Sequence, residues 1–373
     1  MGRVSRFGQH LYEGRVSFDF VGRRKLWYAI SAAIIVVAAL GFVVRGFNMG
    51  IEFTGGVEFT AKVATADDAA IDTMTQAVED ADVPAAGDPV VNTSGSDSIR
   101  IHTKSLTQDQ ASTIEKSLTD AGAQEVSQNL IGPSWGQQVA TKALTGLLVF
   151  VVIVVLFIWA YFREWRMSAA AIIALAHDLV ITAGVYAWSG FEVTPATVTG
   201  LLTILGYSLY DTVVVFDKVR ENTKGVLRST TRTYAEQANL AVNQTLVRSI
   251  NTSITALLPV VALLVVGAGV LGTGPLKDLA LALFVGMAAG TYSSICIATP
   301  LASQLRERDR EVAAHTKRVL ARRAKGEARG DDEPKAAATE RPVKVSGSAG
   351  RQQPTKSSRS SRTKGAANRR EKR

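Results

Sequence analysis

ALTGLLVFVVIVVLFIWAYF, residues 143–162, contains no charged side chain and is long enough to cross a membrane as one helix. About 20 apolar residues, rising 1.5 Å each, are needed to cross ~30 Å of hydrocarbon. Five further runs carry little or no charge and have similar length, at 26–44, 168–188, 196–216, 253–271 and 279–300. Soluble folds do not need apolar runs of this length. The sequence therefore predicts an all-α membrane bundle of six helices.

Charge is distributed unevenly along the chain. The net charge is +9, but segment 48–140 is acidic and the chain from residue 304 onward is strongly basic. Lys and Arg also gather in the loops after the second and fourth apolar runs, and the positive-inside rule places such loops in the cytoplasm. We therefore expect both termini in the cytoplasm and segment 48–140 on the outer side of the membrane.

Segment 48–140 has the pattern of a small folded domain. Its expected order is βαββαβ, which is the ferredoxin-like split βαβ arrangement of an α+β sandwich. That fold occurs with many functions and assigns none by itself. The expected elements are strand 57–63, helix 67–82, strands 89–93 and 98–102, helix 107–121 and strand 124–130.

The full chain then divides into five parts. The expected order is a cytoplasmic segment 1–25, a first membrane helix 26–47, the extracytoplasmic domain 48–140, a five-helix membrane domain 141–303 with a cytoplasmic loop 218–249, and a basic tail 304–373. We expect a helix at about 233–246 in the loop, lying along the inner membrane face.

The tail is expected to be mostly disordered, because beyond about residue 320 it is rich in Lys, Arg, Ser, Gly and Pro and has few groups that could form a core. Two partners fit its charge. Anionic lipid is favoured, and contact with ribosomal or other RNA through phosphates is the alternative.

Several enzyme classes lack their signatures. The sequence has no P-loop, no nucleophile elbow and no His-Glu-x-x-His motif. Cys296 is the single cysteine, so a thiolate metal site and an intramolecular disulfide are both excluded. We expect no enzymatic activity, no cofactor and no metal, and we expect any energy source to act through ionisable residues in the membrane spans.

The fourth span carries a polar stripe. Thr199, Thr203, Tyr207 and Asp211 recur every four residues and share one helix face. Arg248 opens the fifth span at a similar depth. An arginine that approaches a carboxylate favours its charged form, and its departure favours the neutral form, as a proton carrier requires. A proton relay of Asp211 and Arg248 is the favoured interpretation, and a structural ion pair is the alternative.

Other polar groups could support such a relay. His177 and Asp178 lie in the third span, where a structural role is equally open because adjacent residues point to different helix faces. Gly286 and Gly290 are spaced to allow close helix contact in the sixth span and carry no functional signal. The supporting candidates are His177, Asp178, Thr203, Tyr207, Asn251 and Thr252.

Motifs spread over the chain before the tail resemble the SecF family of the resistance-nodulation-division superfamily. They are FDFVGRRK at 18–25, GIEFTGG at 50–56, IGPS at 131–134, AHD at 176–178, GYSLYDTVVVFDKVREN at 206–222 and RSINTS at 248–253. Two departures from the family pattern are Glu52 in place of an aspartate, and Leu209-Tyr210 in place of Ile-Asn before the aspartate at 211.

The resemblance implies a non-enzymatic subunit that acts with SecD on the SecYEG channel, with a YajC-type accessory subunit as a further partner. Such a subunit uses the proton gradient to help complete the outward movement of preproteins. The family's functional pair falls on Asp211 and Arg248.

Two rival functions remain as alternatives. The first is a proton-coupled exporter of small molecules or lipids from the same superfamily. The second is a membrane scaffold with no coupling role. Exporters of this kind usually have two six-span halves and larger outer domains, which makes the first rival less consistent with the sequence.

Overall fold

The computed structural model describes residues 17–94, 96–269 and 275–327. Within these residues, six helices are long and apolar enough to cross a membrane, which confirms the predicted multi-pass helical bundle. The first five are α2 (Arg24–Val44), α6 (Pro133–Phe162), α7 (Trp165–Ser189), α8 (Pro195–Thr223) and α9 (Tyr234–Gly269). The sixth is built from α10 (Pro275–Ser293), a π-helical turn η3 (Ser294–Ala298) and α11 (Thr299–Glu307).

Two helix boundaries differ from the sequence expectation. Helix α6 begins ten residues earlier than the uncharged run, because Pro133 at its first turn starts a helix readily. The helix expected at 233–246 is the first part of α9, so it is continuous with the fifth span and is not a separate surface helix. Only residues 224–233, including the short η2 (Val226–Arg228), connect α8 to α9.

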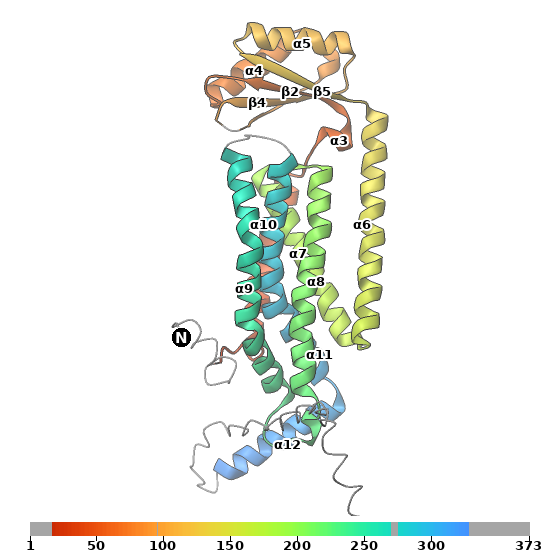
Figure 1. Cartoon of the computed structure of the whole chain (residues 1–373), viewed down its shortest axis with the longest axis vertical. Coiled ribbons are helices and arrows are strands. Elements are labelled where there is room, and N and C mark those ends of the chain that lie inside the picture. Colours follow the sequence, from red (N-terminus) through yellow and green to blue (C-terminus); the bar gives the residue numbers. More distant parts are fainter. Residues whose placement is uncertain (1–16, 95, 270–274, 328–373) are drawn as a thin grey trace, which may run out of the picture. The chain divides into compact units, whose positions relative to one another are not determined.

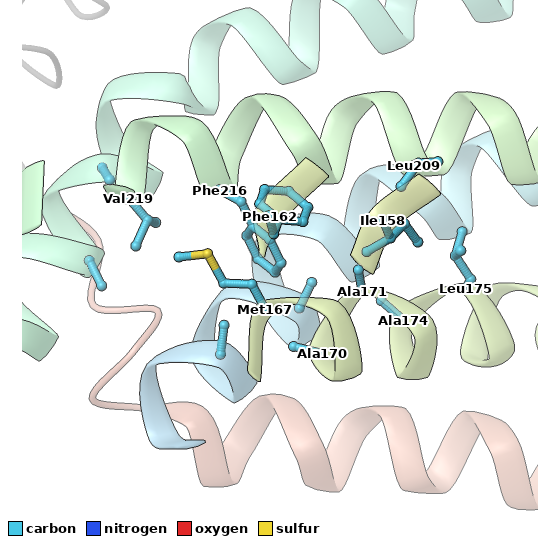
Figure 2. Close-up of a cluster of buried hydrophobic side chains, with 14 of the residues drawn as sticks. Ile158, Phe162, Met167, Ala170, Ala171, Ala174, Leu175, Leu209, Phe216 and Val219 are labelled. Carbon is cyan, nitrogen blue, oxygen red and sulfur yellow. The ribbon is translucent and has the colours of Figure 1, made fainter. Parts of the chain in front are cut away.

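An apolar cluster holds α6, α7 and α8 together. Figure 2 shows Phe216 of α8 meeting Phe162 of α6 and Met167 of α7, and all three side chains are buried. The two phenyl rings pack edge to face, with centroids 5.4 Å apart. The small side chains of Ala170, Ala171 and Ala174 allow α7 to approach its neighbours closely.

Phe216→Ala should destabilise the bundle. Truncating a buried Phe in a soluble protein costs about 3–5 kcal/mol. Lipid is as apolar as the protein interior, so the loss of hydrophobic transfer free energy does not contribute here. Only the lost packing contacts and the cavity contribute, and we expect the free energy of unfolding to fall by about 3 kcal/mol. Free energies of unfolding measured in detergent micelles test this. Val152→Ala, on an exposed face of α6, is the matched control, and equal effects of the two substitutions would contradict the packing shown in Figure 2.

Helices α8 and α10 pack through two glycines. A Cβ atom at Gly286 would lie 2.1 Å from Cδ1 of Ile204, and one at Gly290 would lie 2.8 Å from Cβ of Ser208. Neither glycine could become alanine without moving the facing helix. The close contact predicted from the Gly-x-x-x-Gly spacing is therefore confirmed.

A four-stranded antiparallel sheet lies between α2 and α6 in the chain. Its strands are β2 (Gly56–Lys62), β3 (Val90–Thr93), β4 (Ser98–Thr103) and β5 (Glu125–Ile131), in the order β3-β4-β2-β5. Helices α4 (Asp68–Asp80) and α5 (Gln108–Asp120) pack on the sheet (Figure 1). The alternating residues Val57, Phe59 and Ala61 of β2 are fully buried in this core.

The two ends of this sheet unit meet at a glycine pair. The chain enters through β1 (Asn48–Met49), α3 (Ile51–Thr54) and Gly55-Gly56, and it leaves at Gly132 into α6. Gly55 and Gly56 have φ angles of 71° and 137°. A Cβ atom would lie 2.7 Å from Cα of Pro133 at Gly55, and 2.4 Å from the carbonyl oxygen of Thr103 at Gly56. Only glycine fits this crossing without strain.

The first part of the tail is helical, which corrects the expectation of disorder between about 320 and 327. Helix α12 (Arg310–Glu327) buries Val312 and Val319. Nε2 of its His315 lies 2.8 Å from the carbonyl oxygen of Ser229. These contacts hold the first half of the helix, and beyond residue 320 the Arg323 side chain pairs with Glu236 at 2.6 Å. The predicted disorder of 328–373 lies outside the described residues.

Candidate functional site

Asp211 lies on α8 inside the bundle and is 5% exposed. Its Oδ1 accepts a hydrogen bond of 2.7 Å from the hydroxyl of Ser249 on α9. Its Oδ2 accepts one from the hydroxyl of Ser294, the first residue of the π-helical turn. The carboxyl group is therefore held by hydroxyl donors from two other helical segments.

Arg248 does not contact Asp211. Its side chain is exposed, and Nη2 donates to the hydroxyl of Tyr210 over 3.3 Å. Among the described residues no ion pair joins Arg248 to Asp211, so the structural ion pair considered from the sequence is not formed here. The reason is helical geometry, since adjacent residues on α9 point about 100° apart and Ser249 faces the carboxyl group.

The predicted polar stripe on α8 separates into two parts. Tyr207 is half-buried and its hydroxyl bonds Oγ of Ser253 at 3.0 Å. Thr203 and Thr199 are exposed, and each hydroxyl donates to its own helix, at the carbonyl oxygens of Thr199 and Pro195. Among the predicted supporting residues on α9, Asn251 is exposed and Thr252 is half-buried.

His177 and Asp178 both belong to a second buried network, although they are adjacent and were expected to point to different helix faces. Nδ1 of His177 lies 3.1 Å from Oδ1 of Asp178, and its Nε2 lies 3.2 Å from Oγ of Ser31 on α2. Oδ2 of Asp178 accepts hydrogen bonds from Ser208 on α8, at 2.6 Å, and from Ser293 on α10, at 2.9 Å. Asp178 is 1% exposed.

The serines that hold these two carboxyl groups were missed in the sequence. A small hydroxyl residue within an apolar run gives little signal, because serine is tolerated throughout membrane helices. A signal was available for two of these serines, because Ser208 and Ser249 stand within the GYSLYD and RSINTS stretches at 206–211 and 248–253. The missed residues are Ser31, Ser208, Ser249, Ser293 and Ser294.

A proline follows the π-helical turn at the start of α11. Pro300 has no N–H group, and its ring clashes with the carbonyl of the residue four positions earlier, Cys296. The helix widens over Ser294–Ala298, and the hydroxyl of Thr299 donates to the carbonyl oxygen of Ser294 over 3.0 Å. Single π-helical turns of this kind are frequent at functional sites.

A separate charged cluster joins the sheet unit to the membrane helices. Strand β6 (Glu192–Val193), between α7 and α8, pairs in parallel with β1. Glu192 is buried, and its Oε2 lies 2.8 Å from Nη1 of Arg100 on β4. Nε2 of His102 lies 2.9 Å from Glu58 on β2 and 3.3 Å from Glu192. We call Glu58, Arg100, His102 and Glu192 the docking cluster.

The docking cluster is better described as an ion-pair network than as a metal centre. Glu58, His102 and Glu192 are close enough to share a cation. However, Arg100 already supplies a positive charge to Glu192 at 2.8 Å and would repel a metal ion. The sequence-based expectation of no metal site stays a prediction.

Glu58 makes the docking cluster sensitive to acid. Burial alone would raise the pKa of Glu58, but the hydrogen bond with His102 and the charge of Arg100 hold that pKa below its ordinary value. Because the folded pKa is depressed, Glu58 stabilises the folded state above its unfolded pKa, and this stabilisation is lost as pH falls through the folded pKa. Burial raises the pKa of nearby Glu52, with Glu58 and Glu192 adding to the effect.

Glu192→Gln should loosen the contact between the sheet unit and the membrane helices. Removing one partner of a buried ion pair costs up to about 3–5 kcal/mol, and the cost is smaller here because Nε of Arg100 also lies 3.6 Å from Oε2 of Glu58. We expect faster hydrogen exchange at the amide of Gly50, which bonds the carbonyl oxygen of Val193 at 3.0 Å. Glu125→Gln, at an exposed position of β5, is the control. Equal exchange rates in both variants would show that the docking cluster does not hold this junction.

Two models of known families match this chain, one over most of the membrane helices and one over the segment that contains the Gly55-Gly56 pair. The model described as "Protein export membrane protein SecD/SecF, C-terminal" matches residues 111–308, more than half of the chain. The model "SecD/SecF GG Motif" matches residues 41–67, which include Gly55-Gly56. The chain belongs to the SecD/SecF family.

Members of the SecD/SecF family align with most of this chain. Protein translocase subunit SecF of Streptomyces coelicolor is 49% identical, over 90% of this chain and 90% of its own length. The SecF of Mycobacterium tuberculosis strain H37Rv is 44% identical, over 91% of this chain and 80% of its own length.

A SecD/SecF family member of known structure shares the fold. The crystal structure of SecDF from Thermus thermophilus, a translocon-associated membrane protein, matches with a TM-score of 0.69 and 33% identity. The match covers 79% of this chain and 39% of that chain, so this chain spans about two fifths of the length of SecDF.

Proposed function

We propose that this chain is the SecF subunit of a bacterial protein translocase. Two relatives of this name, 49% and 44% identical, align with it over nearly its whole length. We further propose SecD as its partner. This is supported by SecDF of Thermus thermophilus, of whose length the chain matches 38% at 34% identity, so that a SecD portion can account for the remainder.

We propose that Asp211 carries protons during export and that Arg248 modulates its charge. The observation that carries this proposal is a buried carboxyl group that, among the residues the structure describes, accepts its hydrogen bonds from the hydroxyls of Ser249 and Ser294. Hydroxyl groups can donate to an ionised carboxylate and accept from a neutral carboxylic acid, so this setting accommodates both protonation states. Ionisable groups within membrane spans commonly form proton relays.

Reconstitution tests the proposed function directly. Vesicles are prepared with the SecYEG channel, its ATP-driven motor and SecD, either with or without this chain. We expect export of a preprotein to gain a dependence on the proton gradient when the chain is present, and an ionophore to remove that gain. Export that is equal with and without the chain would overturn the proposal and favour the scaffold interpretation.

We also propose that the sheet unit is an extracytoplasmic ferredoxin-like domain and that both termini are in the cytoplasm of a cell with this chain in its inner membrane. The antiparallel order β3-β4-β2-β5, with helices after β2 and β4, supports the fold. The acidic sheet unit and the basic η2 and α12 segments support the orientation.

Cysteine labelling tests this orientation. A membrane-impermeant reagent added from outside the cell should modify a Cys at exposed Ser96 and spare one at exposed Thr230. Native Cys296 is buried and should not react. Labelling of position 230 alone would reverse the proposed orientation.

Further partners are proposed from family membership. They are the SecYEG channel, the preprotein, a YajC-type accessory subunit and anionic lipid at the basic tail. The chain is proposed to act without enzymatic chemistry of its own. Co-purification from native membranes should recover SecD and SecY with this chain, and recovery of neither would contradict the assembly.

A further inference from the structure

The two buried carboxyl groups are connected through consecutive residues. Ser293 donates to Oδ2 of Asp178, and Ser294 donates to Oδ2 of Asp211. Both serines are 0% exposed. Asp178 belongs to α7 and Asp211 to α8, so two adjacent hydroxyls on the sixth span link carboxyl groups from two different helices.

Each serine hydroxyl has one proton and two possible acceptors. Oγ of Ser293 also lies 3.2 Å from the carbonyl oxygen of Gly290, and Oγ of Ser294 lies 3.1 Å from that of Thr291. An ionised carboxylate only accepts, so it attracts the serine proton. A neutral carboxylic acid can donate to the serine oxygen, and the serine proton is then free to bond the helix carbonyl.

This choice of acceptor occurs where the helix changes form. Ser293 ends α10 and Ser294 begins the π-helical turn. The carbonyls of Gly290 and Thr291 lie in the last α-helical turn before that change. A hydrogen bond moved from a carboxyl group to one of these carbonyls therefore alters the backbone bonding of this turn.

We propose that Ser293 and Ser294 couple Asp178 to Asp211, so that the protonation state of one carboxyl group sets the hydrogen bonding of the other. Asp178 is then a positioning residue for the reaction at Asp211, and it acts through the serine pair. This inference rests on the proposed role of Asp211 in proton transfer and adds a second carboxyl group to that role.

Infrared spectroscopy of the full chain in lipid membranes tests the coupling. Spectra are recorded over a range of pH, and the C=O stretching bands of the protonated carboxyl groups are assigned with Asp178→Asn and Asp211→Asn. Asparagine at 178 stays neutral at every pH, so we expect Asp178→Asn to remove the Asp178 band and to shift the Asp211 band at pH values where Asp178 is ionised in the wild type. We call the shift of the Asp211 band caused by Asp178→Asn the cross effect. It should be lost when Ser293→Ala and Ser294→Ala are both present.

Two controls separate coupling from loss of structure. Ser253→Ala removes a buried hydroxyl that bonds Tyr207 and Thr291 but neither carboxyl group, and the cross effect should persist in it. Threonine at 293 and 294 keeps the hydroxyls and should restore the cross effect. The coupling is wrong if Asp178→Asn leaves the band of Asp211 unshifted in the wild-type background, or if the cross effect survives the double alanine variant.

This result is independent of the proposed function. The spectra require no export activity, so a cross effect can be present even if Asp211 carries no protons during export. Conversely, an Asp211→Asn variant that exports normally would remove the proposed function and leave the measured coupling intact.

Discussion

Asp211→Asn should reduce preprotein export in reconstituted vesicles to the rate seen without a proton gradient. The amide keeps the shape of the side chain and can still accept from Ser249 or Ser294, but it cannot bind and release a proton. Because the folded structure loses no volume, membrane insertion and binding of SecD should be unchanged. The full loss of the gradient-dependent part of export is the largest effect that we expect from any single substitution.

The matched control for this experiment lies on the same helix. Asp217 is exposed at the far end of α8, and its Oδ2 accepts from the hydroxyl of Tyr161 over 2.7 Å. Asp217→Asn makes the same chemical change outside the buried network and should leave the gradient-dependent part of export in place. Normal gradient-dependent export by the Asp211→Asn variant would exclude the relay.

Arg248→Met should remove most of the gradient-dependent part of export. The methionine keeps much of the length of the side chain but has no charge that could favour the ionised form of Asp211. In the structure the guanidinium is at the hydroxyl of Tyr210, the residue before Asp211, so the Arg248 side chain or α9 must move to bring the charge to the carboxyl group. Export rates with and without an ionophore measure this effect.

Arg228→Met is the control for the loss of one cation. Arg228 is exposed at the end of η2, in the connection between α8 and α9. Its substitution should leave the gradient response unchanged. If the Arg248 and Arg228 variants behaved alike, the proposed role of Arg248 would be wrong, and the contact with Tyr210 would have only a structural meaning.

Elements that depend on composition and local pattern could be predicted from the sequence. The six apolar runs correspond to the six long helices, because length and hydropathy decide whether a helix can span a membrane. The pattern of residues 57–63 indicated β2, and the Gly-x-x-x-Gly spacing indicated a close helix contact of the sixth span, although not that α8 is the partner. Each of these predictions needs only the residues of a single helix or strand.

Features that depend on how helices are rotated against each other could not be predicted. The stripe from Thr199 to Asp211 shares one face of an ideal helix, yet Thr199 and Thr203 are exposed and only Tyr207 and Asp211 meet α9. The sequence also offered Arg248 as the partner of Asp211, whereas the rotation of α9 brings Ser249 there. A difference of one residue along a helix is about 100° around it, which decides which partner is met.

The sequence also did not predict helix α12 or the π-helical turn. Helix α12 is strongly basic, and its fold depends on contacts with the connection between α8 and α9 that composition does not reveal. Pro300 was visible in the sixth apolar run, but a proline can end, kink or widen a helix, and the surrounding helices select among these outcomes.

Infrared difference spectroscopy during an imposed proton gradient tests the central claim most directly. Vesicles that contain the assembled translocase with this chain are compared before and after the gradient is applied, in the wild type and in the Asp211→Asn variant. We predict a change in the C=O stretching region of protonated carboxyl groups that is present in the wild type and absent in the variant. A change of equal size in both proteins, or no change in the wild type, would contradict proton transfer at Asp211.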